Sequence, residues 1–257
     1  MAQNSKALAG KHAVVTGGAR GIGAAVTRAL AAHGVKVTML GRSAAPPSDL
    51  ASKPDLHYVQ ADVREPDTLA RAFDSARAAF GPIHILVNNA GQGRSAPFMK
   101  TDLELWRGMM QVNLDGPFHC IHAVLPGMLE AGWGRIVNVA STAGLTGYSY
   151  VSAYCAAKHG VVGLTRSLAL EVAAKGVTVN AVCPGYTETE MLQRTIDGIV
   201  AKTGRTAAEA RAELSSRNPQ KRMVQPEEVA NAVAWLCLPG SEAITGQSIA
   251  IAGGEVM

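Results

Sequence analysis

Residues 12–23 read HAVVTGGARGIG, an apolar β-branched run that passes through a glycine loop into an apolar, helix-like run. Glycine at positions 17, 21 and 23 permits a tight turn, close approach of a pyrophosphate and close packing of the helix on the strand. The start of the helix then offers free N–H groups to a phosphate. The spacing G-x-x-x-G-x-G differs from the dinucleotide fingerprint G-x-G-x-x-G, and a tight turn without a ligand is the alternative. Because the loop joins a strand to a helix at the head of a βαβ unit, we predict nucleotide binding at Gly17, Gly21 and Gly23.

The alternation of strand and helix continues along the chain. The predicted strands are residues 12–16, 35–40, 56–60, 83–87, 135–140, 177–182 and 247–252. The predicted helices are residues 22–33, 67–80, 103–131, 151–174 and 226–238, with the third divided around Gly116 and Pro117. Strands that are apolar throughout, such as IHILV at 83–87, fit a sheet that is buried on both sides. We therefore predict an α/β fold in which residues 1–257 form one domain, a Rossmann-like, doubly wound parallel sheet of about seven strands with helices on both faces.

Residues 188–222 interrupt this alternation with a long, polar, alanine-rich segment that has no strand-like run. Such a segment inside a compact α/β domain is more often a lid than a loop without a role. It carries the basic residues Lys202, Arg205, Arg211, Arg217, Lys221 and Arg222, among others. A basic lid suits an anionic tail such as CoA or a phosphopantetheine carrier, and solvated faces of a lid helix explain the same residues.

The composition indicates a globular protein, with 47% apolar and 17% charged residues in 257. We expect no signal peptide and no membrane span, because no run approaches roughly 18 apolar residues. The four cysteines form no CxxC pair, which predicts reduced thiols and a cytoplasmic protein. The net charge of +4 is spread without a dense basic block, so nucleic-acid binding is unsupported and an anionic small ligand is the simpler partner. The histidines have no metal-like partner set, and we predict no metal site.

The end of the second predicted strand bears on the choice of dinucleotide. The fingerprint places a carboxylate there to bind the ribose 2′-hydroxyl. This chain reads Gly41-Arg42-Ser43 instead, and Arg20 in the glycine loop adds a second positive group. A guanidinium attracts a 2′-phosphate that a carboxylate would repel. We predict that NADP(H) is preferred and that NAD(H) is a possible second cofactor; the alternative is that Arg42 is a solvated surface arginine.

Residues 141–160, STAGLTGYSYVSAYCAAKHG, hold three tyrosines and one lysine. Tyr154 and Lys158 are four positions apart and share a helix face. One ammonium at about 4 Å, with an effective dielectric near 20, supplies roughly 4 kcal/mol, which is about three pKa units. We therefore expect Lys158 to lower the pKa of the Tyr154 phenol toward the working range of an acid–base group. Tyr148 and Tyr150 lie in the preceding loop, either as a wall of the substrate pocket or as surface packing.

Taken together, the motifs resemble those of the short-chain dehydrogenases/reductases, over about residues 12–254. They are TGGARGIG (16–23), Asp62-Val63, Asn88-Asn89-Ala90-Gly91, Asn113 in QVNLDG, Ser141 in VNVAST, Tyr154-x-x-x-Lys158, and Pro184-Gly185 followed by Thr189. The serine stands thirteen residues before the tyrosine and the lysine four after it, a highly specific combination downstream of a glycine loop.

The resemblance implies a catalytic tetrad of Asn113, Ser141, Tyr154 and Lys158. Nicotinamide would pass hydride to a carbonyl carbon, Ser141 would donate a hydrogen bond to the oxygen, and Tyr154 would give it a proton. Lys158 would also hold the ribose, and Asn113 would position a water molecule that relays the proton. The implied cofactor residues are Gly17, Arg20, Gly21, Ile22, Gly23, Gly41, Arg42, Asp62, Val63, Asn89, Ala90, Gly91, Tyr154, Lys158, Pro184, Gly185, Thr187 and Thr189. The family usually forms tetramers or dimers through two long helices, which predicts a homotetramer or homodimer.

Two departures from the family pattern stand out. Family members often read YxASK where this chain has Tyr154-Cys155-Ala156-Ala157-Lys158, with the Tyr–Lys spacing intact. They often end in V-D-G-G where this chain has Ile251-Ala252-Gly253-Gly254, which removes a carboxylate.

The substrate is less well determined. Residues 92–98, 142–150 and 188–222 should form its pocket. Similarity to 3-oxoacyl and polyketide ketoreductases favours an NADP(H)-dependent oxidoreductase of ketones or secondary alcohols, with a 3-oxoacyl thioester as the first candidate. A dehydrogenase of a cyclic or aromatic secondary alcohol is the alternative. A non-catalytic NADP(H) sensor has no need of the tetrad, and a sugar-nucleotide epimerase usually needs a separate substrate domain.

Overall fold

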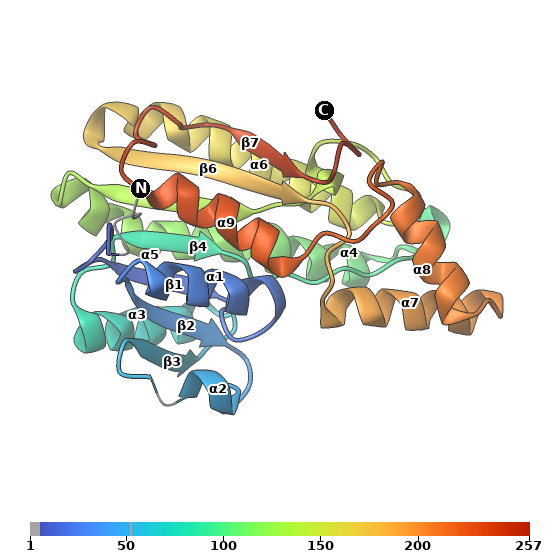
Figure 1. Cartoon of the computed structure of the whole chain (residues 1–257), viewed down its shortest axis with the longest axis horizontal. Helices are drawn as coiled ribbons and strands as arrows, with labels where there is room; N and C mark the ends of the chain where they lie inside the picture. Colours follow the sequence, from blue (N-terminus) through green and yellow to red (C-terminus); the bar gives the residue numbers. More distant parts are fainter. Residues whose placement is uncertain (1–5, 52) are drawn as a thin grey trace.

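The computed structural model describes residues 6–51 and 53–257 and is built on a sheet of seven parallel strands (Figure 1). The strand order is β3-β2-β1-β4-β5-β6-β7. The strands are β1 (His12–Thr16), β2 (Lys36–Gly41), β3 (Leu56–Gln60), β4 (Ile85–Asn88), β5 (Gly134–Val139), β6 (Val177–Pro184) and β7 (Ser248–Ile251). Every residue of β1, β4, β5 and β6 is buried, as expected for central strands with both faces covered.

Helices cover the sheet on two sides (Figure 1). They are α1 (Gly21–Ala32), α2 (Ser48–Ala51), α3 (Pro66–Phe80), α4 (Leu103–Met110), α5 (Gly116–Glu130), α6 (Ser152–Val172), α7 (Glu190–Thr203), α8 (Ala207–Ser216) and α9 (Pro226–Cys237). Successive side chains of a strand point to opposite faces, so Ala13 and Val15 pack with α1 and α9. Val14 packs on the other side with α3, α5 and α6.

The strand order reverses between β1 and β4, and this reversal locates the site. The chain runs from β1 outward to β2 and β3, and then returns to β4 on the other side of β1. In an open parallel sheet, ligands bind beyond the carboxyl ends of the strands at such a switch point. The glycine loop follows β1 and the Asn-Asn-Ala-Gly motif follows β4, so both reach this edge.

The predicted α/β fold, with a doubly wound parallel sheet, helices on both faces and a helical lid, is confirmed, and element ends differ from the predictions by one or two residues. The short helix α2 was not predicted. The helix predicted over 103–131 is divided by a π-helical turn, Gln111–Asp115, so the division begins before Gly116 rather than around it. Gly116 serves a different purpose: a Cβ there would lie 2.9 Å from Val63 Cγ2, so glycine lets α5 approach the loop after β3.

Residues 188–222, the predicted lid, contain no strand and form the helices α7 and α8. Thr189 and Thr206 cap α7 and α8 by accepting backbone N–H groups, and Glu209 completes a capping box with Thr206. The two helices share a small apolar cluster that includes Leu192, Ile196 and Leu214. In Figure 1 they extend to the right of the sheet, past the carboxyl ends of the strands. None of the helices described between residues 6 and 257 is both long enough and apolar enough to cross a membrane.

Candidate active site

The glycine loop is tied to the end of β4 by hydrogen bonds. Thr16 Oγ1 accepts the backbone N–H groups of Asn89 at 3.0 Å and Ala90 at 2.9 Å. The side-chain amide of Asn89 donates in turn to the carbonyl oxygens of Thr16, at 2.9 Å, and Gly17, at 3.2 Å. Because these bonds join two strands on either side of the switch point, they fix the loop at the amino end of α1, where a pyrophosphate would bind.

Glycine is required in this loop for steric reasons. Gly17 and Gly21 have φ of +66° and +49°, in the left-handed region that favours glycine. A Cβ on Gly23 would lie 2.1 Å from the carbonyl oxygen of Gly17 and 2.6 Å from Asn89 Nδ2. A Cβ on Gly21 would lie 3.1 Å from Thr189 Cγ2, so the start of the lid also closes against the loop.

The carboxyl end of β2 is cationic. Arg20 donates to Ser43 Oγ, and its guanidinium lies 3.6 Å from Glu190 at the start of α7. Gly41 continues β2 and abuts the ring of Tyr58, whose hydroxyl donates to Ser43 O at 2.7 Å. No carboxylate follows Gly41 in the sequence; Arg42 does. Arg20 and Arg42 therefore flank Ser43 at the place where a 2′-phosphate would need positive charge.

The loop after β3 contains a further arginine that the sequence analysis missed. Asp62 accepts hydrogen bonds from Arg64, the shortest of them 2.6 Å. Arg64 is the main cause of the lowered pKa of Asp62, and Arg42 contributes to it. Val63 beside Asp62 is buried against Gly116. Asp62 and Val63 thus lie at the same edge of the sheet, and the Asp-x-Arg spacing was the available signal for the ion pair.

Lys158 lies in the centre of the site and is only 4% exposed. Its Nζ donates to the carbonyl oxygen of Val139, at the end of β5, over 2.8 Å. A Cβ on Gly91 would lie 3.7 Å from Lys158 Nζ and 3.0 Å from Asn113 Oδ1. Two predicted tetrad members therefore converge on Gly91, the last residue of the Asn-Asn-Ala-Gly motif.

Tyr154 lies on α6, one helical turn before Lys158, and Ser141 lies at the carboxyl end of β5. Ser141 Oγ accepts the N–H of Ala143 at 3.1 Å, which caps a short 3₁₀ turn, and the Ser141 hydroxyl acts to lower the pKa of the Tyr154 phenol. Lys158 Nζ lies 5.7 Å from the centroid of the Tyr154 ring. This capping bond is compatible with the predicted catalytic role of Ser141, because the cap uses an oxygen lone pair and leaves the hydroxyl proton to be donated.

The expected effect of Lys158 on Tyr154 is wrong for this structure. Burial raises the pKa of Tyr154 to about 12, and the hydrogen bond with Ser141 opposes that rise. Burial also lowers the pKa of Lys158 to about 8, with the Cys183 thiol opposing the change. The expectation placed an ammonium about 4 Å from the phenol, with an effective dielectric near 20. The lysine instead directs its Nζ to Val139 O, and desolvation of both groups dominates.

Asn113 is completely buried in the π-helical turn. Its side-chain amide donates to the carbonyl oxygens of Gln92 and Met109, both at 3.0 Å, and its Oδ1 accepts the N–H of Gln92 at 3.2 Å. Both amide donors are therefore used within the protein. The side chain fastens the loop after Gly91 to the helix, and a π turn supplies the extra residue that turns it inward.

A buried polar chain behind the site was also missed. Asn88 Nδ2 donates to Asn138 Oδ1, and Asn138 Nδ2 donates to Thr165 Oγ1, each over 2.9 Å. These bonds join β4, β5 and α6, the element that carries Tyr154 and Lys158. An asparagine in each of two apolar strands was the signal, since buried amides need partners.

The end of β6 approaches the glycine loop from the other side of the site. Pro184 closes β6, and the N–H of Gly185 donates to Ile251 O at 3.1 Å. Thr187 Oγ1 donates to Gly185 O at 2.9 Å, and Thr189 caps α7 beside Gly21. The predicted cofactor residues therefore line one edge of the sheet from β3 to β6, with Ile22 in the first turn of α1.

The two other tyrosines of the loop differ. Tyr148 is half-buried, and its hydroxyl lies 2.8 Å from both Thr142 Oγ1 and Glu255 Oε1. Tyr150 has a φ of 68°, is 67% exposed, and accepts the N–H of Ala96 through its backbone oxygen. Tyr148 thus faces the site, whereas Tyr150 lies at the surface.

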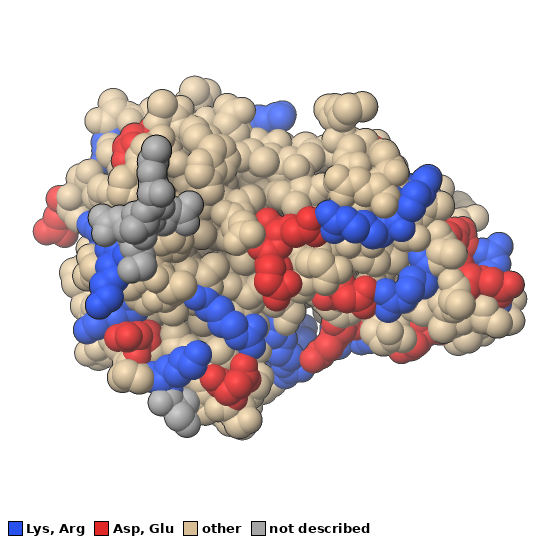
Figure 2. Space-filling model, viewed as in Figure 1, with Lys and Arg blue, Asp and Glu red and all other residues tan. Residues whose placement is uncertain are grey.

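Most basic residues of the lid already have partners. Arg211 binds Glu188, Arg222 binds Glu228 and Arg205 binds Glu213. Figure 2 shows this alternation of blue and red side chains over the lid. Lys202 contacts Ser95, and Lys221 donates to Ser216 O. Arg217 stacks over the Tyr148 ring at 5.0 Å, so it reaches the loop that precedes α6.

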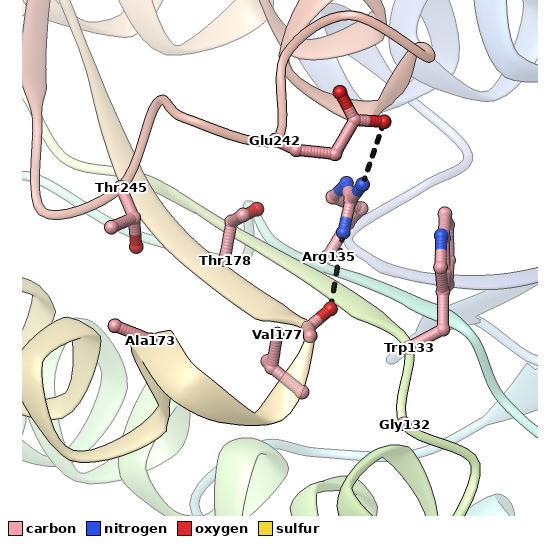
Figure 3. A pocket seen from close by; sticks show the side chains of 9 residues that line it. Gly132, Trp133, Arg135, Ala173, Val177, Thr178, Glu242 and Thr245 are labelled. Atoms are coloured by element: carbon pink, nitrogen blue, oxygen red, sulfur yellow. Dashed lines mark hydrogen bonds and ion pairs between the residues drawn. The ribbon is translucent and has the colours of Figure 1, made fainter.

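A separate cavity of about 220 Å³ lies at the amino ends of β5 and β6, at the opposite edge of the sheet (Figure 3). Arg135 enters it, stacks over Trp133 at 4.4 Å, and lies 3.6 Å from Glu242. None of the predicted site residues lines this cavity. Over the described parts of the chain, no three His, Cys, Asp or Glu side chains are grouped as metal ligands would be.

Comparison with known proteins agrees with this geometry. The sequence profile of the short chain dehydrogenase family matches residues 11–200. A D-beta-hydroxybutyrate dehydrogenase of Rhizobium meliloti is 37% identical over 255 residues, covering 95% of this chain and 98% of the relative. A putative ketoacyl reductase of Streptomyces coelicolor is 39% identical, covering 94% and 95%.

A solved structure is similar in both fold and sequence. The crystal structure of a variant of actinorhodin polyketide ketoreductase with NADPH superposes with a TM-score of 0.89 at 37% identity, covering 95% of this chain and 97% of that one. The seven-stranded sheet, the glycine loop at its switch point and the Ser-Tyr-Lys cluster at its carboxyl edge agree with these matches. The chain belongs to the short chain dehydrogenase family and is an NAD(P)-dependent oxidoreductase that transfers hydride between nicotinamide and a ketone or secondary alcohol.

Proposed function

We propose that the protein is an NADP(H)-dependent ketoreductase in which Tyr154 is the proton donor. The observation that carries this proposal is the convergence of Ser141, Tyr154 and Lys158 beside the glycine loop. The hydroxyl of Ser141 lies near enough to that of Tyr154 to affect its pKa, so a carbonyl oxygen placed between the two hydroxyls would accept from both. When bound, the nicotinamide supplies the hydride that reduces the carbonyl carbon.

The ionisation of the site favours the direction of reduction. With a pKa raised to about 12, Tyr154 is protonated at neutral pH and can give its proton to the carbonyl oxygen. In the oxidation of an alcohol, the phenol of Tyr154 must first lose its proton so that it can act as a base, and burial opposes that loss. The positive charge of an oxidised nicotinamide would lower the pKa of Tyr154 and would thereby favour oxidation.

Lys158 and Asn113 act as supports in this scheme. Lys158 donates one hydrogen bond, to Val139 O, among the described residues, which leaves two N–H groups for ribose hydroxyls. Asn113 holds the loop after Gly91 through its bonds with Gln92, and a water relay at this position would use its remaining acceptor capacity or its backbone rather than its amide donors.

The preference for NADP(H) is supported by charge. Arg20 and Arg42 flank Ser43 at the end of β2, where an NAD-binding chain would carry a carboxylate. Asp62 is neutralised by Arg64, so it does not oppose a 2′-phosphate with a free negative charge. NAD(H) remains a possible second cofactor.

For the substrate we propose a 3-oxoacyl thioester. Relatives that carry this class in their names include an acetoacetyl-CoA reductase of Shinella zoogloeoides at 37% identity and the ketoacyl reductase described above. Three arginines of the lid are already paired with glutamates, so the basic residues of the lid are weaker evidence for an anionic carrier than the sequence alone indicated. A cyclic secondary alcohol is the second candidate, because a cis-4-hydroxycyclohexanecarboxylate dehydrogenase of Sinomonas cyclohexanicum is 39% identical over 255 residues.

We further propose that the chain acts as one domain with residues 188–222 as its lid, in a cytoplasmic homotetramer or homodimer. The exposed apolar side chains Phe118 on α5 and Leu170 on α6 support association through the long helices. All four cysteines are free thiols, which suits a reducing compartment.

The function is tested by NADPH oxidation at 340 nm with a panel of ketones and acyl thioesters, run again with NADH. Tyr154→Phe should lower kcat by about 10²–10⁴-fold and leave the Kd for NADPH unchanged, because it removes only the transferred proton. Tyr150→Phe is the matched control, since this side chain lies at the surface, and it should retain activity. Activity that survives in Tyr154→Phe would assign the proton to another group. Tight NADPH binding without turnover of any substrate would favour a sensor.

A further inference from the structure

The last residues of the chain bring a carboxylate to the substrate side of the site. Glu255 Oε1 lies 2.8 Å from the hydroxyl oxygen of Tyr148, which also lies 2.8 Å from Thr142 Oγ1. A carboxylate only accepts and a phenol has one proton, so Tyr148 donates to Glu255 and Thr142 donates to Tyr148. Thr142 is buried and directly follows Ser141. A hydrogen-bonded chain therefore connects Glu255, through Tyr148, to Thr142, the neighbour of Ser141 in the sequence.

The second oxygen of Glu255 lies against the end of β6. A Cβ on Gly185 would be 3.0 Å from Glu255 Oε2 and 3.4 Å from Ala252 Cβ. The position of Ala252 is the one at which related chains often carry an aspartate. This chain replaces that carboxylate by a buried alanine and presents another one, three residues later, to the same glycine. Unlike a side chain at position 252, Glu255 also contacts Tyr148 on the substrate side.

The other charges around this carboxylate do not cancel it. Arg217 stacks over the outer face of the Tyr148 ring, but its side chain is exposed, so solvent and salt screen its charge. Glu255 is half-buried and fixed by Tyr148. Burial is the main cause of the raised pKa of both Tyr148 and Tyr186, and the charge of Glu255 adds to it in both cases. Arg217 lowers the pKa of Tyr186 and so opposes this effect. Glu213, which also acts on Tyr186, is bound to Arg205.

We propose that Glu255 is a specificity-determining residue, which disfavours substrates with a free carboxylate beside the reacting carbonyl and favours neutral esters, thioesters and ketones. The inference rests on the proposed function and narrows its substrate class. A second negative charge several ångströms from a half-buried carboxylate is repelled strongly enough to change kcat/KM by about tenfold to a hundredfold.

The test compares acetoacetate with its ethyl ester, which share one ketone and differ by one negative charge. We expect the wild-type enzyme to prefer the ester, and we expect Glu255→Gln to lower the ester-to-acid ratio of kcat/KM by at least about tenfold. Glu171→Gln is the matched control for net charge. It is exposed at the end of α6, at the opposite edge of the sheet, and should leave the ratio unchanged.

Tyr148→Phe separates the effect of charge from an effect on position, because it removes the hydrogen bond and keeps the carboxylate. The ratio should stay on the side of the ester in this variant. A fall like that of Glu255→Gln would show that Glu255 acts only by holding Tyr148, and would overturn the proposal. A wild-type preference for the acid, or a ratio that Glu255→Gln does not change, would overturn it as well. Reduction of neither compound, nor of any ketone in the panel, would instead contradict the proposed function from which the inference starts.

Discussion

Alanine at position 23 should disrupt the cofactor site even though alanine forms helices better than glycine. The added Cβ would lie 2.1 Å from Gly17 O and 2.6 Å from Asn89 Nδ2. A carbon–oxygen contact needs roughly 3.3 Å, so the loop and α1 must separate by about 1 Å. Overpacking of this kind costs about 1–3 kcal/mol, and each of the two Asn89 hydrogen bonds contributes about 1 kcal/mol. After a gain of about 1 kcal/mol in helix propensity, we expect Gly23→Ala to lower the free energy of unfolding by about 3 kcal/mol.

The measurement is urea unfolding followed by tryptophan fluorescence, at equal protein concentration, together with titration of NADPH. Gly127→Ala is the matched control, because Gly127 also lies in a helix, α5, and a Cβ there would meet no atom within 4 Å. It should raise the free energy of unfolding by about 0.5–1 kcal/mol. We expect Gly23→Ala to weaken NADPH binding by at least about tenfold, since the loop amides would no longer converge on the phosphates. If Gly23→Ala were as stable as Gly127→Ala and bound NADPH with the wild-type Kd, the steric reasoning would be refuted.

Two further outcomes concern charge. Arg42→Asp should lower the NADPH-to-NADH ratio of kcat/KM by about tenfold or more, while Arg71→Asp on the exposed face of α3 should not; an unchanged ratio would show that Arg42 does not contact the 2′-phosphate. Burial lowers the pKa of Lys158 to about 8 in the folded protein from 10.5, so between pH 8 and 10 the unfolded chain binds more protons and folding becomes more favourable as the pH rises. The free energy of unfolding should therefore rise relative to Lys158→Met across this window, by up to about 3 kcal/mol, and a constant difference would contradict the lowered pKa.

The sequence determined the fold and was enough to predict a catalytic cluster. Strands such as HAVVT and helices such as IGAAVTRALAAH have local patterns, and the glycines at fixed spacing between them indicate a tight strand-to-helix turn without knowledge of distant contacts. Tyr154 was distinguished from Tyr148 and Tyr150 by its spacing in the sequence, thirteen residues after Ser141 and four before Lys158. The π-helical turn and α2 were not predicted, because neither has a periodic signal of its own.

The tertiary structure alone decided how these groups ionise and what surrounds them. The pKa of Tyr154 depends on desolvation, which no spacing reveals, and the direction of Lys158 depends on a carbonyl of a neighbouring strand. The basic residues of the lid gave less support for an anionic substrate because Arg205, Arg211 and Arg222 bind glutamates in the folded chain. Tyr148 and Glu255 meet although 107 residues separate them. Local patterns fix which elements form, whereas burial and contacts between distant segments fix the charge and selectivity of the site that those elements build.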